Sequence, residues 1–442
     1  MRVESYQSAV DPGKSGREMH ELMCKLYPIC RSITGDGVRQ TLKILQEYVP
    51  LAVQEVPTGT RVFDWTIPME WNIRSAYVRD PQGRKIIDFE KSNLHVLNYS
   101  VPVHSKVTLE ELRAHLYTIP EHPDWIPYRT SYYKENWGFC ISHNQLLGLT
   151  DGEYEVYIDA SLQNGSLTYG ECFVKGQTDD EILISTHICH PSLANDNLAG
   201  ISVATFLARY LHRLSTRYSY RFLFTPGTIG SIAWLSQNEH QISRIKHGLV
   251  LACLGDSGKI TYKKTRRDNA EIDRVTMRVL QETGDPHSIL DFSPYGYDER
   301  QFASPGFNLP VGCFMRTAHG EFQEYHTSAD NLDFVKPQYL AHSFSVCSRV
   351  FEVLEQNRTY CNTNPKCEPQ LGRRGLYNAI GGNADGRLHE LALLWVLNLS
   401  DGAHSLLDIA SQSTLRFEII EKAAEALLKQ GLLKEQGGLF QE

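Results

Sequence analysis

The alternation of apolar runs with amphipathic segments between about residues 152 and 356 constrains the fold of this 442-residue chain more than any other feature. Short runs rich in β-branched and aromatic residues predict strands, whereas apolar residues at helical spacing predict helices. The expected elements, in chain order, are the hairpin YEVYIDA and ECFVKG, then EILIS, helix 198–212, YRFLFT, helix 229–239, GLVLACL, helix 272–283, LPVGCFM and helix 338–356. This order predicts an α/β domain with three layers, in which helices cover both faces of a mixed sheet.

The loop that follows the strand EILIS concentrates side chains that can bind a metal. It reads THICHPSLANDNLAG, residues 186–200, and contains His187, Cys189, His190 and Asp196. Open α/β sheets build their binding sites at the carboxyl ends of strands, and imidazole together with carboxylate suits zinc. The loop therefore predicts a metal site. A purely structural role, in which His187 and His190 only hydrogen-bond the loop, is the alternative.

Three neighbouring strand ends carry further candidates. Asp256 follows GLVLACL, His326 lies in EYHTSAD beyond LPVGCFM, and TPGTIGS follows YRFLFT at the start of a helix. Taken singly, a turn or helix cap accounts for Asp256 equally well, and a surface position accounts for His326. Because parallel strands end at one edge of a sheet, we expect these loops to converge on a crevice. Such convergence fits a two-metal site with a shared carboxylate.

The chain divides by composition into three predicted regions. Residues 1–60 and 150–360 are expected to form the α/β domain, with helical segments between about 16 and 51. Residues 61–149 are rich in aromatics, prolines and short alternating runs, which predicts a β-rich inserted domain. Within it, Arg129 and Tyr132 belong to the cluster PYRTSYYKENWGFC, which suits a buried core corner and a substrate-facing wall about equally. The segment NRTYCNTNPKCEPQ is expected to be a linker.

Residues 370–442 have the outline of a winged-helix domain, with three amphipathic helices, a turn and a short strand at GGLF. Binding of DNA would require a basic recognition helix. The bases near the last helix are offset by acids: Arg416, Lys422 and Lys429 stand beside Glu418, Glu421 and Glu425. We therefore expect no nucleic-acid partner, and a role in protein contacts or homo-oligomer formation instead.

Composition excludes several classes of protein. The net charge of -8 and a pI near 6.1 argue against a general polyanion binder. The N-terminal stretch MRVESYQSAVDPGKSG is polar and unlike a signal peptide, and no apolar run approaches the length of a membrane span. The ten cysteines form no CxxC pairs, which is typical of thiols in a reducing compartment. We expect a cytoplasmic protein without a membrane partner.

The series THICHPSLANDNLAG, TPGTIGS, GDSGK and EYHTSADNLDF resembles the bacterial aminopeptidase-like family related to the M28 zinc peptidases, over nearly the whole chain. The resemblance implies a zinc-peptidase-like fold, a β-rich insert and a C-terminal winged helix. It also implies one or two zinc ions, and a place in polysaccharide or natural-product biosynthesis. Carried onto this sequence, the pattern implies that His187, Asp196 and Asp256 bind one metal. Asp196 would then bridge to a second metal that also uses His326.

Two positions depart from the pattern of this family. Cys189 stands where M28 enzymes place an aspartate, and either binds metal as thiolate or is simply buried. Gly227 stands where relatives carry a glutamate in the sequence PETIGS. A general base contributes about 100- to 10,000-fold in rate, so the gap leaves three alternatives open. Glu321, Glu324 or Glu299 supplies the base, the enzyme is a one-metal hydrolase or cyclase, or the site binds a ligand without chemistry.

The leading hypothesis is a zinc-dependent aminopeptidase-like amidohydrolase that acts on a small amine-bearing, modified or short peptide-like substrate. Arg129, Tyr132, Tyr297, Asp298 and Arg316 are the candidate substrate contacts, and the segment SPYGYDER and Arg316 suit a structural role equally well. The alternative hypothesis is a catalytically degenerate metal-binding homologue that serves as a ligand-binding or scaffold protein, because a carboxylate is missing at position 227.

Overall fold

The computed structural model describes residues 12–377 and 384–436, which fall into two compact units. The first unit comprises the chain up to residue 277 together with 285–348, and the second comprises 278–284 and the chain from 349 onward. Residues 61–149, expected as a separate insert, lie within the first unit. The expected GGLF strand and most of the polar N-terminal stretch lie outside the described residues.

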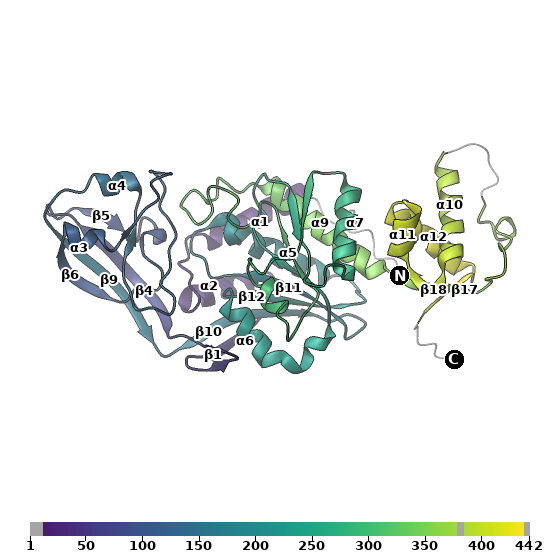
Figure 1. Ribbon diagram of the computed structural model, residues 1–442, viewed down its shortest axis with the longest axis horizontal. Helices are drawn as coiled ribbons and strands as arrows, with labels where there is room; N and C mark the ends of the chain where they lie inside the picture. The colour runs from purple at the N-terminus through teal and green to yellow at the C-terminus, as the bar shows by residue number, and fades with distance from the viewer. Residues whose placement is uncertain (1–11, 378–383, 437–442) are drawn as a thin grey trace. The chain divides into compact units, whose positions relative to one another are not determined.

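An eight-stranded mixed sheet forms the centre of the first unit (Figure 1), which confirms the predicted α/β class. Its order is β1-β10-β12-β11-β13-β16-β14-β15, and the four strands from β12 to β16 are parallel. The strands are β1 (Ala52–Pro57), β10 (Ser166–Val174), β11 (Glu181–His187), β12 (Ser219–Thr225), β13 (Ile245–Leu251), β14 (Ile260–Lys263), β15 (His287–Leu290) and β16 (Val311–Met315). All seven residues of both β11 and β12 are buried, which explains the apolar runs ILI and FLF at their centres.

The helices between these strands place the loops of interest on one edge. The chain runs from β11 through α5 (Gly200–Leu211) to β12 on one side, and returns through α6 (Ile229–Asn238) to β13 on the other. Right-handed crossovers in opposite directions put α5 and α6 on opposite faces of the sheet. The carboxyl ends of β11 and β12 therefore flank a topological switch point, where such sheets form a crevice. The other helices of the layers are α1 (Pro12–Leu26), α2 (Asp36–Leu45), α7 (Glu271–Thr283), α8 (Glu299–Phe302) and α9 (Pro337–Gln356).

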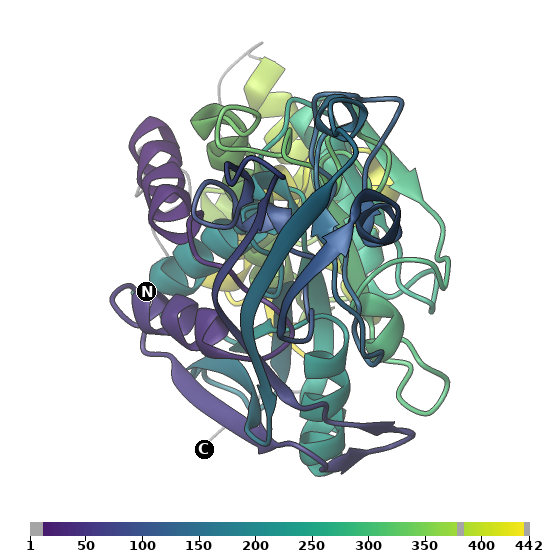
Figure 2. The same cartoon turned by 90° about the vertical axis from the view of Figure 1, so that its left-hand side faces the viewer.

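A second sheet of four antiparallel strands, ordered β5-β4-β9-β6, also belongs to the first unit. Figure 2 shows its long strands in blue and teal, with α1 and α2 in purple. Its strands are β4 (Glu70–Arg79), β5 (Lys85–Asp88), β6 (Val103–Thr108) and β9 (Glu153–Gln163). Because β9 pairs with β4 up to Gln163, this sheet extends past residue 149, the predicted end of the insert. Short elements complete the region: β2 (Arg61–Val62), β3 (Trp65–Thr66), β7 (Leu116–Tyr117), β8 (Phe139–Cys140), α3 (Leu109–Arg113) and α4 (His143–Leu147).

Beyond the end of α9, the described part of the second unit contains a three-stranded sheet and the helices α10, α11 and α12, in agreement with the predicted winged helix. The elements are β17 (Thr359–Asn362), α10 (Ala384–Leu399), β18 (Asp401–Ser405), α11 (Leu406–Ser413), α12 (Phe417–Lys429) and β19 (Leu433–Glu435). Ser405 caps α11 by accepting a hydrogen bond from the backbone N–H of Asp408. The segment expected as a linker contains β17, which pairs with both β18 and β19. Its four residues have no apolar alternation to reveal a strand.

Two bulk properties of the chain follow from the described residues. All ten cysteines are free thiols, and six of them are buried. None of the helices in the described ranges is both long and apolar enough to cross a membrane.

Candidate metal centre

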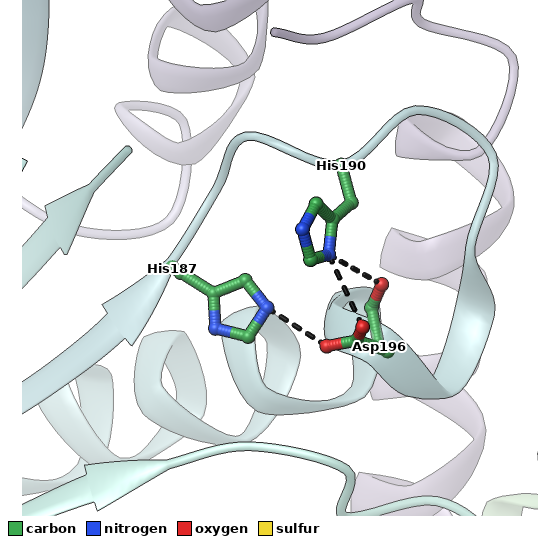
Figure 3. A group of neighbouring side chains, drawn as sticks. All are labelled: His187, His190 and Asp196. Carbon is green, nitrogen blue, oxygen red and sulfur yellow. Dashed lines mark hydrogen bonds and ion pairs between the residues drawn. The ribbon is translucent and has the colours of Figure 1, made fainter. Parts of the chain in front are cut away.

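The carboxylate of Asp196 is the centre of a cluster of imidazole side chains (Figure 3). His187 Nε2 lies 2.8 Å from Asp196 Oδ1, and His190 Nδ1 lies 3.2 Å from Oδ2. His326 Nε2 lies 2.9 Å from the same Oδ2. His187 is the last residue of β11, His190 follows in the loop, and Asp196 comes from the segment Ala194–Ala199. His187, His190 and Asp196 each offer a ligand atom within 4.8 Å of the other two.

The backbone around Asp196 is held in a non-helical conformation by a second carboxylate, that of Asp330. Asp330 Oδ2 accepts the N–H of Asp196 at 2.9 Å, and its Oδ1 accepts the N–H of Asn195 at 2.6 Å. Asp196 has φ -110° and ψ 79°, which is not helical although it lies in a helical segment. Asp330 therefore replaces intrahelical hydrogen bonds and aims the Asp196 side chain at the histidines. Asp330 was not predicted as a site residue.

His326 is positioned by the β-rich region of the first unit. Its backbone carbonyl accepts the N–H of Tyr128 at 2.8 Å, and the N–H of Ser328 donates to the carbonyl of Ile126 at 2.8 Å. His326 has φ 56°, in the left-handed region that non-glycine residues seldom adopt. The ring of Tyr128 packs edge-on against His326 and His190, each at a centroid distance of 5.2 Å.

The charges and the burial in this cluster keep Asp196 ionised and shift the pKa values of the histidines around it. Burial alone would raise the pKa of Asp196, but His190 and His187 outweigh it and hold this pKa well below its ordinary value. Burial lowers the pKa of His187 to about 4 and also lowers that of His326, although Asp196 opposes both shifts. For His190 the charge of Asp196 overcomes burial, and the pKa is raised well above its ordinary value. A neutral imidazole is the form that binds a metal.

A second group of ligand-type side chains shares the same carboxylate. Asp196, Cys253 and His319 each place one ligand atom within 4.8 Å of the other two. Cys253 follows β13 by two residues, and His319 lies in the loop after β16. Burial, together with Asp196, raises the pKa of the Cys253 thiol well above its ordinary value. Neither Cys253 nor His319 was predicted as a site residue, because each is an isolated residue with no recognisable spacing.

Asp256, predicted as a metal ligand, is engaged elsewhere in the structure. Its Oδ1 accepts from the Thr317 hydroxyl at 2.7 Å and the Gly258 N–H at 2.6 Å. Its Oδ2 accepts from the Asn195 side-chain amide at 2.8 Å and the Thr317 N–H at 3.3 Å. The structure does not bring Asp256 into either group of ligand atoms around Asp196. It instead ties the loop after β13 to the segment that carries Asp196.

The side chain of Tyr297 fills the space at Gly227. A Cβ added to Gly227 would lie 1.8 Å from Tyr297 Cε1. The Tyr297 hydroxyl lies 3.3 Å from His190 Nε2 and 3.4 Å from Cys189 Sγ, and its ring lies 4.0 Å from the ring of His187. The structure therefore brings three predicted residues, Tyr297, Cys189 and His190, together with the glycine that departs from the family pattern.

Asp298 is buried next to Tyr297. Its Oδ1 accepts a hydrogen bond from Ser231 Oγ at 2.9 Å, whereas its buried Oδ2 has no partner among the described residues. Burial raises the pKa of Asp298 to about 7. Glu299, one of the bases considered, is paired with Lys263 and accepts the N–H of Tyr297 at 3.0 Å. Asp298 is thus the carboxyl in this segment with a free buried oxygen.

The remaining predicted residues lie around this cluster. Glu321 is exposed and Glu324 is half-buried, both on the loop between β16 and α9, and neither carboxylate is hydrogen-bonded to Asp196 or its histidines. Arg129 is exposed, and the Tyr132 hydroxyl bonds the hydroxyl of Tyr128 at 3.0 Å. Arg316 donates to His342 Nδ1 at 3.0 Å and lies over the ring of Tyr339. Tyr132 thus supports Tyr128, which packs against His190 and His326. Arg316 packs against α9.

Comparison with known proteins identifies the family. Residues 20–357 match a family described as "Domain of unknown function (DUF4910)", and residues 358–435 match a winged helix-turn-helix family. The chain belongs to the DUF4910 family. A relative from Clostridium acetobutylicum, named as a candidate polysaccharide biosynthesis protein with an aminopeptidase-like domain, is 54% identical over 421 residues, or 95% of this chain and 97% of the relative. The predicted resemblance to aminopeptidase-like proteins is therefore confirmed.

Solved structures confirm the fold. The crystal structure of a candidate peptidase from Clostridium acetobutylicum has a TM-score of 0.92 at 52% identity, and the match covers 96% of this chain and 97% of that one. A zinc aminopeptidase from Bacillus subtilis has a TM-score of 0.57 at 14% identity, covering 77% of this chain and 94% of that one. At this low identity the likeness concerns the fold alone, which is that of a zinc aminopeptidase.

Proposed function

We propose that this protein is a zinc-dependent amidohydrolase that acts on a small substrate with a free or modified amine. The observation that carries the proposal is the convergence of His187, His190 and His326 on the two oxygens of Asp196. The donor set fits zinc, which accepts imidazole nitrogen and carboxylate oxygen. We propose His187, His190, Asp196 and His326 as the residues that hold it. When bound, zinc supplies Lewis acidity, which polarises a carbonyl and lowers the pKa of water.

The side chains around this cluster would bind and orient the substrate. We assign Asp298 to the substrate amine, because its buried Oδ2 lacks a partner among the described residues and an ammonium would supply one. A cation beside this carboxyl favours its ionised form. The ring of Tyr128 covers two of the histidines and limits the access of water on that side. For proton transfer we keep Glu324 and Glu321 as candidates, since both lie on the loop that carries His319 and His326.

A role in polysaccharide or natural-product biosynthesis is part of the same proposal. It is supported by the name of the relative from Clostridium acetobutylicum, which refers to polysaccharide biosynthesis. A small substrate would agree with the position of Tyr128, because its ring covers His190 and His326 and leaves less room on that side. The winged-helix unit is proposed as a contact surface for homo-oligomers.

Metal analysis and an aminoacyl-amide assay test the proposed function. Protein purified without chelators should retain zinc, and chelation should abolish amine release until zinc is returned. Asp298→Asn should raise KM by about 10- to 100-fold, because a buried hydrogen bond to a charged group is lost. Asp333→Asn, which alters an exposed carboxylate on the loop after His326, is the matched control and should leave KM unchanged. Protein that binds no zinc would overturn the proposal.

A second candidate function is supported by the loop after β12. Because Tyr297 fills the position of a side chain at 227, the protein could bind metal and ligand without turnover. The double variant Gly227→Glu with Tyr297→Ala restores both the carboxylate and the space that it needs. Activity in the double variant alone would support the degenerate homologue, whereas comparable activity in the parent would reject it.

A further inference from the structure

Arg31 is a fully buried cation in the connection between α1 and α2. Its guanidinium bonds two backbone carbonyls and forms no ion pair with a carboxylate of the described residues. By contrast Arg221, another buried arginine, pairs with Glu181 at 2.6 Å and with Glu171. Removing a charged side chain from water costs several kcal/mol unless an opposite charge compensates it. The described side chains therefore leave the positive charge of Arg31 without a counter-ion.

Two of the three nitrogens of this guanidinium are fixed by the backbone. Arg31 Nε donates to the carbonyl of His190 at 2.8 Å, and Nη1 donates to the carbonyl of Leu26, at the end of α1, at 2.7 Å. Nη2 is buried and has no hydrogen-bond partner among the described residues. Buried polar atoms are almost always paired, and an exception calls for an explanation such as a bound ligand. Because Nε and Nη1 are anchored, Nη2 is a pre-organised donor for an anion.

Arg31 borders the histidine cluster around Asp196. The carbonyl that it contacts belongs to His190, and the ring of Tyr128 packs edge-on against the ring of His190. Burial lowers the pKa of Arg31 to about 10, and the charges of Cys30, Cys189 and Tyr128 oppose this shift. Arg31 is therefore protonated at neutral pH, and none of the side chains that act on its charge is a carboxylate.

The arginine predicted as a substrate contact, Arg316, has different surroundings. Burial lowers the pKa of Arg316, and the charges of Asp256, Tyr339 and Asp285 oppose this shift. Two carboxylates thus already act on its charge. Arg31 was not predicted as a site residue, because an isolated arginine in a connection between helices has no recognisable spacing. Its surroundings nevertheless suit an anionic ligand better than those of Arg316.

Arg31 and Asp298 both lie next to the same histidine. Arg31 contacts the backbone carbonyl of His190, whereas Asp298 follows Tyr297, whose hydroxyl lies 3.3 Å from His190 Nε2. The buried Oδ2 of Asp298, like Nη2 of Arg31, has no partner among the described residues. An unpartnered donor on a cation and an unpartnered acceptor on a carboxyl therefore lie around one residue of the cluster. A small molecule with groups of both charges would satisfy the two atoms.

We propose that Arg31 binds a carboxylate of the substrate, so that the protein acts on small amides that carry both a free amine and a carboxylate. This inference rests on the proposed function, because it adds a carboxylate to the substrate whose amine we assign to Asp298. A carboxylate has one negative charge and balances one guanidinium, with which it forms a strong charge-assisted hydrogen bond. A phosphate dianion would leave a net charge buried. A long peptide would place its carboxylate too far from its amine.

Two probes without an amide bond test this assignment independently of turnover. 5-Aminopentanoate carries an amine and a carboxylate at about the separation found in a dipeptide, and pentylamine carries the amine alone. Isothermal titration calorimetry of the full-length protein measures both affinities. We expect 5-aminopentanoate to bind about 10- to 100-fold more tightly, because its carboxylate accepts a hydrogen bond from a buried cation.

The outcomes separate this inference from the proposed function. Equal affinities, or no binding of either probe, would overturn the carboxylate site. Neither result would change zinc retention or amine release, which test the proposed function. Protein that retains no zinc but keeps the preference for 5-aminopentanoate would reject the proposed function alone.

Variants of Arg31 assign the preference to this side chain. Arg31→Gln should remove the difference between the two probes, whereas a purely structural role of Arg31 would weaken both probes by the same factor. Arg31→Lys keeps the charge but not the planar fork, and should retain part of the difference. Arg113→Gln, which alters an exposed arginine on α3, is the control and should keep the full difference. Should Arg31→Gln fail to fold, the affinities of the parent still decide whether a carboxylate is recognised.

Asp298→Asn separates the two ends of the substrate. Because both probes carry the amine, this variant should weaken both by a similar factor and keep the preference for 5-aminopentanoate. Loss of the preference in Asp298→Asn, with none lost in Arg31→Gln, would overturn the assignment of the carboxylate to Arg31.

Discussion

The loops after β11 and β12 begin side by side, with His187 paired to Thr225 in register, yet they differ in content. The β11 loop contributes two histidines and Asp196, all buried. The β12 loop, residues 226–231, contains no ionisable side chain, and an aromatic ring from elsewhere lies against its glycine. The comparison teaches that the first loop gathers side chains that could hold a cation, whereas the space at Gly227 in the second loop is filled by the ring of Tyr297.

The largest expected effect follows from removing the carboxylate of the β11 loop. Asp196→Asn should abolish metal binding and lower the free energy of unfolding of the metal-free protein by about 3–5 kcal/mol, because a buried charged histidine loses its partner. Metal counting and urea denaturation measure the two effects. The exposed Asp333→Asn control should change stability by less than about 0.5 kcal/mol. Equal stability of the two variants would show that the β11 loop is not organised by this charge.

The next effect concerns a buried carboxyl beside the β12 loop, Asp298. Its pKa is raised from 3.8 to about 7, so the unfolded chain ionises first and the free energy of unfolding falls as pH rises between these values. Asp298→Asn lacks this loss and can still accept from Ser231. Between pH 4 and 7 the free energy of unfolding of the variant should therefore rise relative to that of the parent, by up to about 4 kcal/mol. Denaturant melts of metal-free protein across this range measure the gain, and parallel pH curves would contradict it.

A smaller effect is expected from restoring a side chain to the β12 loop. Gly227→Glu should destabilise the protein by about 3 kcal/mol, because the new Cβ would collide with the ring of Tyr297. Tyr297→Ala in the same chain should recover at least about 1 kcal/mol of this loss, as a double-mutant cycle would measure. Gly306→Ala is the control, since an added Cβ there meets no atom within 4 Å. If the effects of the two substitutions on the free energy of unfolding were additive, the side chain at position 227 and the ring of Tyr297 would not interact.

The smallest effect is expected where the two loops touch. Cys189 Sγ lies 3.7 Å from the carbonyl of Gly227 and 3.4 Å from the Tyr297 hydroxyl. Both contacts are long and weak, so Cys189→Ser should lower the free energy of unfolding by less than about 1 kcal/mol and leave metal binding unchanged. Loss of an ion in this variant would instead make Cys189 a ligand of the β11 loop.

The fold could be predicted from the sequence because its signals are local and repeated. Each apolar run from EILIS to LPVGCFM is long enough to be recognised by itself as a strand. Because predicted helices alternate with these strands in the chain, the connections between neighbouring strands are expected to be helical crossovers. The strand β17 was missed because its residues TYCN lack apolar alternation and are held by backbone pairing with β18 and β19. Such pairing depends on partners far along the chain.

The candidate site could be predicted only where its residues share one loop. His187, His190 and Asp196 lie within ten residues, so their spacing indicated a common purpose. Cys253 and His319 are 66 positions apart, and no spacing connects them. The fit of Tyr297 to Gly227 is equally invisible, because it depends on the shape of a loop that approaches from 70 residues away. These relations exist only after the sheet has brought its strand ends together.

The hydrogen bonds that join residues 126–128 to residues 326–328 limit how this protein can be reduced or recombined. An α/β core trimmed of its β-rich region would lose Tyr128, the backbone partner of His326, whose φ of 56° lies in the left-handed region. The region is therefore not an exchangeable specificity module. Shortened or chimeric versions should be designed to retain residues 126–128, because the histidine cluster around Asp196 is held together by two distant parts of the chain.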